Sequence, residues 1–329
     1  MKTNPKLVSV LKKGWAGMQV LQERLKKQRW IRIFINTALV LFMFFFIARY
    51  IQKDWQEIQK THYSFNLRAL WITLGLYAIN FCLLMVAWLI LLKCFGALKQ
   101  LSYNAFLYSY TYLYRFLPTP VWFIGSRIYY YGQLGIGKRT IVTTTALETL
   151  LHMFTGFIIY CLLLIDFKQP ITWLYSLSVL LIILGIYHSH WFELRWINRE
   201  NSSLRINKTD FTLLLSLYFI TWIISGPFFK MLIQIIYNPV QVSMVSLMRI
   251  WIISSLFAYV GSYTLGGVGV IREFSLTILL SKYLPPSTAL VIIVLVRLVM
   301  TLGGVLWALT IVGIAKLFSR FKRMFNLHD

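Results

Sequence analysis

Long apolar stretches alternate with short polar gaps along most of the chain. A helix needs about 20 mostly apolar residues to cross the hydrocarbon core of a bilayer. The stretches that come close to this length lie at 33–51, 69–95, 101–117, 139–165, 171–187, 211–237, 244–260 and 289–314. We therefore predict an all-α, polytopic integral membrane protein with about eight transmembrane helices.

The composition supports this class of protein. Hydrophobic residues make up 58% of the chain and charged residues 13%, and the mean hydropathy is +0.68. Because soluble domains carry about 25% charged residues, a soluble protein of ordinary type is excluded. The polar gaps are too short for a separate soluble domain, so we predict that 33–316 forms one transmembrane domain.

Basic residues outnumber acidic ones by 33 to 10, which gives a formal net charge of +23. In a soluble protein this excess would suggest a nucleic-acid partner. Here it gathers at the membrane edges, in the segment 1–32, a predicted amphipathic surface helix, and in the tail 317–329. Since basic flanks stay in the cytoplasm, we expect a multi-pass plasma-membrane protein with both ends cytoplasmic and no nucleic-acid partner.

Two of the apolar stretches carry residues that are unusual for a simple spanning helix. In 211–237, the pair Gly226–Pro227 predicts a break, because proline removes a backbone hydrogen bond. The stretch 101–117 is rich in tyrosine, at positions Tyr103, Tyr108, Tyr110, Tyr112 and Tyr114. Tyrosines in this number are typical of an interface or a packed helix, or of the lining of a polar cavity, and the sequence leaves these alternatives open.

Two segments, 116–152 and 263–297, interrupt the apolar pattern in a related way. In each, a turn rich in proline or glycine is followed by an arginine and then by an apolar helix with an ionisable residue. The turn residues are Pro118, Pro120 and Gly125 in the first segment, and Gly266, Gly267 and Gly269 in the second. The ionisable residues are Arg127 and Glu148 in the first segment, and Arg272, Glu273 and Arg297 in the second. We predict two related halves, around 101–165 and 244–314, each with a broken or re-entrant segment.

The ionisable residues predict a polar site inside the membrane. Glu148 and Arg297 lie well inside long apolar helices, where a charge is costly unless it meets a partner or water. A half-helix N-terminus beside an arginine also favours an anion such as a lipid phosphate. We expect these residues to form one polar cluster, which serves either as a substrate or proton pathway or as a structural salt-bridge network between the halves.

Other chemistries find little support in the sequence. Glu148 and His152 share a helix face, but two ligands do not make a metal site. The sequence Gly266-Gly267-x-Gly269 lacks the strand–helix context of a dinucleotide-binding loop. No nucleophile or acid pair forms a convincing catalytic set. We therefore expect neither a metal nor a cofactor, and no enzymatic activity.

Short motifs mark both charged segments. They are Leu117-Pro118, Gly125-x-Arg127 and Ala146-x-Glu148 in the first, and Gly266-Gly267-x-Gly269, Arg272-Glu273 and Arg297-Leu298 in the second. Together with the order of the apolar stretches, these motifs resemble the lysylphosphatidylglycerol synthase transmembrane family, a flippase-like family of integral membrane proteins. The resemblance implies that a lipid moves between leaflets, either an anionic or aminoacylated phospholipid or another lipid-linked substrate.

Roles for the charged residues follow from this hypothesis. We expect Arg127 and Arg272 to contact the head-group phosphate, while Glu148, Glu273 and Arg297 shape the cavity and its switching. Glu148 and Glu273 would suit a cationic head group instead. The expected partners are membrane lipids, and a homo-oligomer or a lipid-synthesis enzyme would also fit.

The chain also departs from the family. We expect it not to aminoacylate lipid, because the soluble synthase half of the larger relatives has no counterpart here. Pro120, Val121 and Trp122 stand where the family's first turn usually has small residues. This departure leaves the identity of the lipid open. Two other functions also stay open, namely a membrane-embedded transferase and a structural partner in lipid or glycolipid synthesis.

Overall fold

The computed structural model describes residues 64–98, 100–116, 120–164, 207–238, 240–264 and 268–324, and within these ranges the regular elements are all helices. Helices long and apolar enough to cross a membrane are α3 (Leu67–Cys94), α6 (Lys138–Leu163), α8 (Lys208–Ile233), α9 (Met244–Thr264) and α11 (Pro286–Met324). The shorter elements are α4 (Leu101–Tyr112), the 3-10 helix η1 (Leu113–Phe116), α5 (Pro120–Gly132) and α10 (Val268–Leu280). The protein is thus a helical, membrane-embedded protein.

Five helices in the described ranges meet the requirements for crossing a membrane. They match the apolar stretches predicted at 69–95, 139–165, 211–237, 244–260 and 289–314. The stretches 33–51 and 171–187 and the segment 1–32 lie outside the described residues. The stretch 101–117 corresponds to α4 and η1, and α4 with its 12 residues is about 18 Å long, too short for a hydrocarbon core of about 30 Å.

The predicted break at Gly226–Pro227 is wrong, because α8 continues through Pro227 to Ile233. Pro227 offers no N–H to the carbonyl of Ile223, but proline is tolerated inside a membrane helix without breaking it. Gly226 serves packing instead. A Cβ there would lie 3.3 Å from Cβ of Met248, so the glycine lets α9 approach α8 closely.

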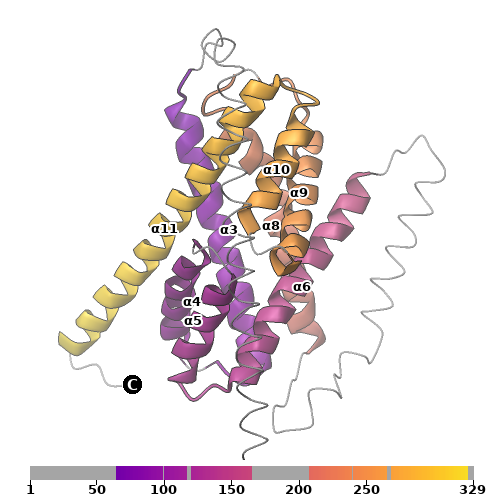
Figure 1. The fold of residues 1–329 in the computed structure, drawn as a ribbon. Helices are drawn as coiled ribbons and strands as arrows, with labels where there is room; N and C mark the ends of the chain where they lie inside the picture. The colour runs from indigo at the N-terminus through magenta and orange to yellow at the C-terminus, as the bar shows by residue number, and fades with distance from the viewer. Residues whose placement is uncertain are drawn as a thin grey trace, which may run out of the picture. The chain divides into compact units, whose positions relative to one another are not determined.

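The long helices pack around three clusters of buried apolar side chains. Helix α3 packs along α8, and α8 also contacts α6 and α9. A Cβ on Gly156 would lie 2.6 Å from the Trp222 indole, so α6 and α8 approach as closely as a glycine allows. Helix α11 contacts α3, α4 and α10. In Figure 1, α4 and α5 lie towards one end of this helix bundle and α10 towards the other.

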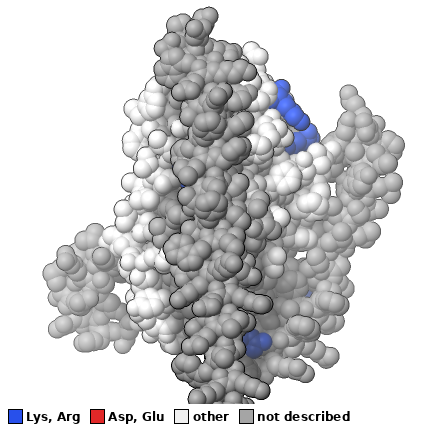
Figure 2. Space-filling model, in the orientation of Figure 1, with Lys and Arg blue, Asp and Glu red and all other residues white. Residues whose placement is uncertain are grey.

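The surface of the bundle fits an apolar solvent. Figure 2 shows a described surface that is almost uncharged, with small basic patches near its upper and lower parts. Large apolar side chains are exposed on several long helices, among them Trp71, Ile223 and Leu302. Exposed apolar surface on this scale is unusual for a protein in water and normal for one in lipid.

Candidate functional site

Arg127 and Glu148 form an ion pair between α5 and α6, which we call the first pair. Nη1 of Arg127 donates to Oε2 of Glu148 at 2.5 Å and approaches the hydroxyl of Thr145 at 3.4 Å. The Arg127 side chain is 1% exposed and that of Glu148 14%. The two helices are joined by a tight turn at Gly135, which adopts a φ of 75° that favours glycine.

Aromatic rings enclose the first pair. The guanidinium carbon of Arg127 lies 3.7 Å from the Trp88 ring centroid and 4.2 Å from that of Phe123. Trp88 is held in turn, because its Nε1 donates to the Tyr131 hydroxyl at 2.8 Å. Cations are attracted to the faces of such rings, most strongly where water is excluded. Any contact between Arg127 and a ligand would therefore require this cage to open.

Glu273 and Arg297 form the second pair, between α10 and α11. Nη1 of Arg297 donates to Oε1 of Glu273 at 2.9 Å. The order of charges is reversed, since the acid now lies on the short helix and the base on the long one. Exposure is reversed as well, because 55% of the Arg297 side chain is exposed but only 7% of Glu273.

The predicted residues thus come together as two pairs rather than one cluster. Among the described residues, no hydrogen bond or ion pair joins the first pair to the second. Arg272 belongs to neither pair. Its guanidinium carbon lies 5.5 Å from the Trp251 ring centroid, and its Nε has no hydrogen-bond partner within the described part.

Sequence reasoning missed Arg115, which lies in η1. Its guanidinium carbon is 5.6 Å from the ring centroid of Tyr112 and 5.8 Å from that of Phe123 on α5. The hydroxyl of Tyr112 lies 3.0 Å from that of Tyr77 on α3. The tyrosine-rich stretch thus contributes to a polar interior through Tyr112, as one of its predicted roles allowed. The position of Arg115 directly before the first predicted turn is a second feature of the sequence that could have identified it.

The predicted turn residues have mixed outcomes. Pro118, Gly266 and Gly267 lie outside the described residues. Pro120 is the first residue of α5, where its fixed φ and missing N–H suit a helix start.

Gly125 and Gly269 were placed in turns wrongly, since Gly125 lies inside α5 and Gly269 is the second residue of α10. Isolated glycines are tolerated in helix interiors at a modest cost, so their presence alone does not mark a turn.

His152 is buried among aromatic rings. Its ring stacks on Trp222 at a centroid distance of 4.5 Å and meets Tyr218 edge-on at 5.4 Å. In the part of the chain that the structure describes, no three His, Cys, Asp or Glu side chains are close enough to hold a metal ion. His152 therefore takes part in packing between α6 and α8.

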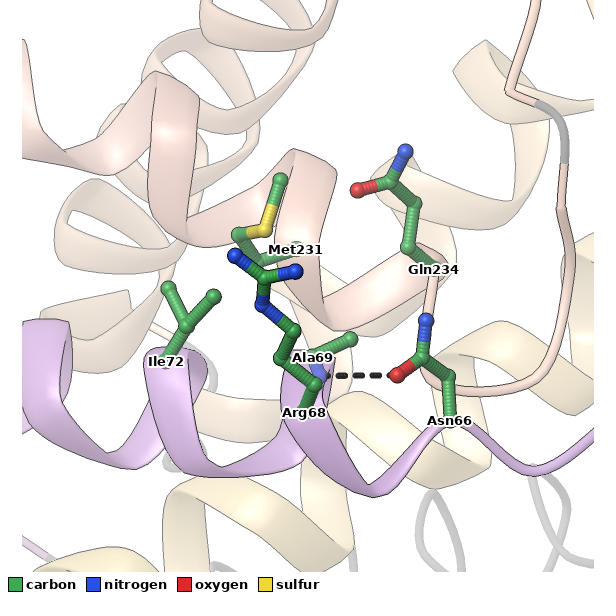
Figure 3. Close-up of a pocket in the computed structure, with 6 residues that line it drawn as sticks. All are labelled: Asn66, Arg68, Ala69, Ile72, Met231 and Gln234. Carbon is green, nitrogen blue, oxygen red and sulfur yellow. Dashed lines mark hydrogen bonds between the residues drawn. The ribbon is translucent and has the colours of Figure 1, made fainter.

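A small open pocket lies where α3 begins and α8 ends (Figure 3). Its volume is about 260 Å³, and it is lined by Asn66, Arg68, Ala69, Ile72, Met231 and Gln234. Asn66 caps α3, because its Oδ1 accepts from the Ala69 amide at 3.1 Å. None of the predicted site residues lines this pocket, so we do not identify it with the candidate site.

Comparison with known proteins leaves the family open. No protein-family model matches the chain, and no curated protein matches it. The resemblance to the flippase-like family therefore stays a prediction, and the function has to be argued from the site itself.

Proposed function

We propose that the protein moves a lipid between the two leaflets of a membrane, with the head group passing polar side chains while the tails stay in the bilayer. One observation carries this proposal. Arg297 is largely exposed although it lies on α11, which has the highest mean hydropathy of the candidate spanning helices in the described ranges.

The depth of Arg297 follows from its place in α11. The spanning segment runs over Pro286–Ile314, so its midpoint is residue 300. Arg297 lies three residues from that point, which at 1.5 Å per residue is about 4.5 Å along the axis. An unpaired arginine at the centre of a membrane helix costs about 2.5–3.5 kcal/mol even by the lowest scales.

The surroundings of Arg297 are apolar on the outer face of α11. Val294, Leu298 and Leu302 are each about half exposed and lie near it along the helix. Glu273 lies behind, buried to 93% and paired with it. We infer that this cation lies near the bilayer centre, on a face of α11 that meets lipid. A phosphate that slides along this surface would find a charged contact where hydrocarbon offers none.

The short helices support a polar path into the bundle. Helices α5 and α10 have 13 residues each, about 20 Å, and do not reach across the hydrocarbon core. We interpret them as re-entrant segments that bring charged side chains to membrane depth, one in each half. The position of Tyr77 is consistent with polar side chains at membrane depth, because it lies ten residues into α3, about 15 Å from the start of that helix.

A membrane-embedded transferase is less consistent with the described residues. The carboxylates within the described ranges are Glu148, Asp210 and Glu273, and each is engaged in an ion pair. No carboxylate in these ranges is therefore free to act as a general base or to bind a metal with a second one.

Reconstitution of the purified chain tests the proposal. Vesicles with and without protein would carry fluorescent phosphatidylglycerol, phosphatidic acid or phosphatidylcholine, and dithionite would report how fast the inner-leaflet label becomes accessible. We expect protein-dependent exchange that is faster for the anionic lipids. Mass spectrometry of the recovered lipids distinguishes the alternative, since a chemically changed lipid with no exchange would support a transferase. No exchange of any of the three lipids by folded protein would contradict the proposal.

A further inference from the structure

The pocket between the start of α3 and the end of α8, which we call the edge pocket, lies away from both ion pairs in the chain (Figure 3). Because α3 has 28 residues, it is about 42 Å long, close to the thickness of about 40–45 Å of a bilayer with its head-group regions. The first turn of α3 therefore belongs at the level of the lipid head groups. The exposure of Trp71, which is 65%, is consistent with this depth, since tryptophan is enriched where a membrane meets water.

Polar side chains line the edge pocket with hydrogen-bond donors, and they are those of Asn66, Arg68 and Gln234. Oδ1 of Asn66 accepts from the Ala69 amide, which leaves the amide nitrogen of Asn66 to point towards Gln234 (Figure 3). Within the described ranges, the side-chain hydrogen bonds and ion pairs do not involve Arg68 or the Gln234 side chain. These donors are therefore available to a ligand.

The backbone holds the two walls of the edge pocket together. The amide of Asn66 donates to the carbonyl of Ile235 at 2.7 Å and so fixes the start of α3 against the end of α8. Ala69 is only 3% exposed, and the two helices pack along each other beyond it. A pocket that is formed in advance loses less free energy to ordering when a ligand binds.

The edge pocket changes from polar to apolar with depth. Ile72 lies four residues further into α3 than Arg68, about 6 Å along the axis, and Met231 lies three residues before Gln234, about 4.5 Å. The polar side chains are thus at the outer end, and the apolar ones are one turn deeper in the membrane. A phospholipid in a bilayer has the same order, with its phosphate outside and its glycerol and chains inside.

We propose that the edge pocket binds the head group of a phospholipid with a single negative charge, as phosphatidylglycerol has, at a site separate from the transport path. Arg68 pairs with the phosphate, and the amides of Asn66 and Gln234 donate to its remaining oxygens. No acidic side chain lines the pocket, so the cation of a zwitterionic head group finds no carboxylate there. The volume of about 260 Å³ is below the range of about 300–1,000 Å³ of pockets that enclose whole small molecules, which suits a head group whose chains stay in the bilayer.

Photocross-linking to the detergent-solubilised full chain tests this site by position. The probe is a phosphatidylglycerol that carries a diazirine on its head group, and mass spectrometry of the digested protein locates the attached lipid. We expect cross-links within 64–72 and 231–235. Unlabelled phosphatidylglycerol should suppress them at concentrations about ten-fold or more below those needed of phosphatidylcholine or glycerol 3-phosphate.

Two variants remove donors from the edge pocket. Arg68→Gln should raise the probe concentration for half-maximal cross-linking about ten-fold or more, the size expected for a lost charge-assisted hydrogen bond. Gln234→Leu keeps the size of the side chain and removes a neutral donor, so we expect a rise of about three-fold. Lys208→Gln is the matched control, because it removes one positive charge from an exposed residue at the other end of α8, and it should behave as the wild type. Thermal stability in the absence of lipid identifies variants that are folded.

Each part of the proposal has an outcome that would overturn it. Cross-links confined to other segments, or unchanged half-maximal cross-linking in folded Arg68→Gln, would overturn the site. Phosphatidylcholine that competes as well as phosphatidylglycerol would overturn the preference for a negative head group, and glycerol 3-phosphate that does so would overturn the lipid source. Because cross-links report where the lipid lies, these results hold whether or not the protein exchanges lipid between leaflets.

Discussion

The first pair and the second pair use the same two side chains in different surroundings. Each joins an arginine to a glutamate across a short and a long helix, with N–O distances of 2.5 and 2.9 Å. In the first pair the arginine is 1% exposed, whereas in the second it is 55% exposed. The two pairs are chemically equivalent, but the arginine of the first pair is enclosed and that of the second is exposed.

The difference follows from what packs around each arginine. Arg127 lies between the rings of Trp88 and Phe123, and the bundle closes over it. Arg297 lies on the outer face of α11 beside exposed aliphatic side chains. We infer that enclosure makes the first pair a structural link between α5 and α6, whereas in the proposed function exposure lets Arg297 exchange its carboxylate partner for a lipid phosphate. A motif shared by two halves thus does not imply a shared role.

The largest effect on stability is expected at Arg127. Arg127→Gln removes a buried guanidinium and leaves Glu148 unpaired, and breaking a buried pair in this way costs about 3–5 kcal/mol. Unfolding in mixed micelles with increasing sodium dodecyl sulfate measures the loss. Lys93→Gln, which breaks the exposed pair of Lys93 with Asp210, is the control and should stay close to the wild type. A loss of unfolding free energy below about 1 kcal/mol in Arg127→Gln would show that the first pair is not a structural link between α5 and α6.

A much smaller loss of stability is expected at Arg297. Arg297→Gln removes a largely exposed charge, and in this variant the positive charge of Arg272 still lies near Glu273. The expected net cost is about 1 kcal/mol, because removing a cation from the centre of a span recovers about 2.5–3.5 kcal/mol and so offsets most of the cost of leaving the buried Glu273 without Arg297. The same micelle unfolding experiment applies. A loss as large as that of Arg127→Gln would remove the distinction between the two pairs.

The spanning helices were predictable because their length and apolar character depend on the sequence alone. The five in the described ranges agree with their predicted stretches to within a few residues, apart from the longer C-terminal end of α11. The stretch 101–117 was overestimated. Its apolar character extends to Leu117, but Pro118 disfavours a helical conformation in the residue before it, and α4 already gives way to a 3-10 turn after Tyr112.

The candidate site was predictable in part. The cost of burying charge identified Glu148 and Arg297, but not which side chains face them, because pairing depends on how helices distant in sequence pack. One cluster was expected and two pairs are found. Arg115 was overlooked since an arginine at a helix end normally serves as an interface anchor. Its contact with the Phe123 ring depends on how α5 packs against η1, which the sequence does not show.

The most direct test of the account is lipid exchange by Arg297→Gln in vesicles, beside the wild type, Arg297→Lys and Lys93→Gln. Lys93 matches Arg297 closely, since it is a 61% exposed cation paired with a carboxylate that is 14% exposed, but it lies at the end of α3 instead of the middle of a span. The account predicts that Arg297→Gln slows exchange of an anionic lipid about ten-fold or more, the effect of losing one charge-assisted contact, while Arg297→Lys retains part of the rate and Lys93→Gln all of it. Wild-type exchange by folded Arg297→Gln would contradict the central claim that an exposed cation at the bilayer centre carries the head group across.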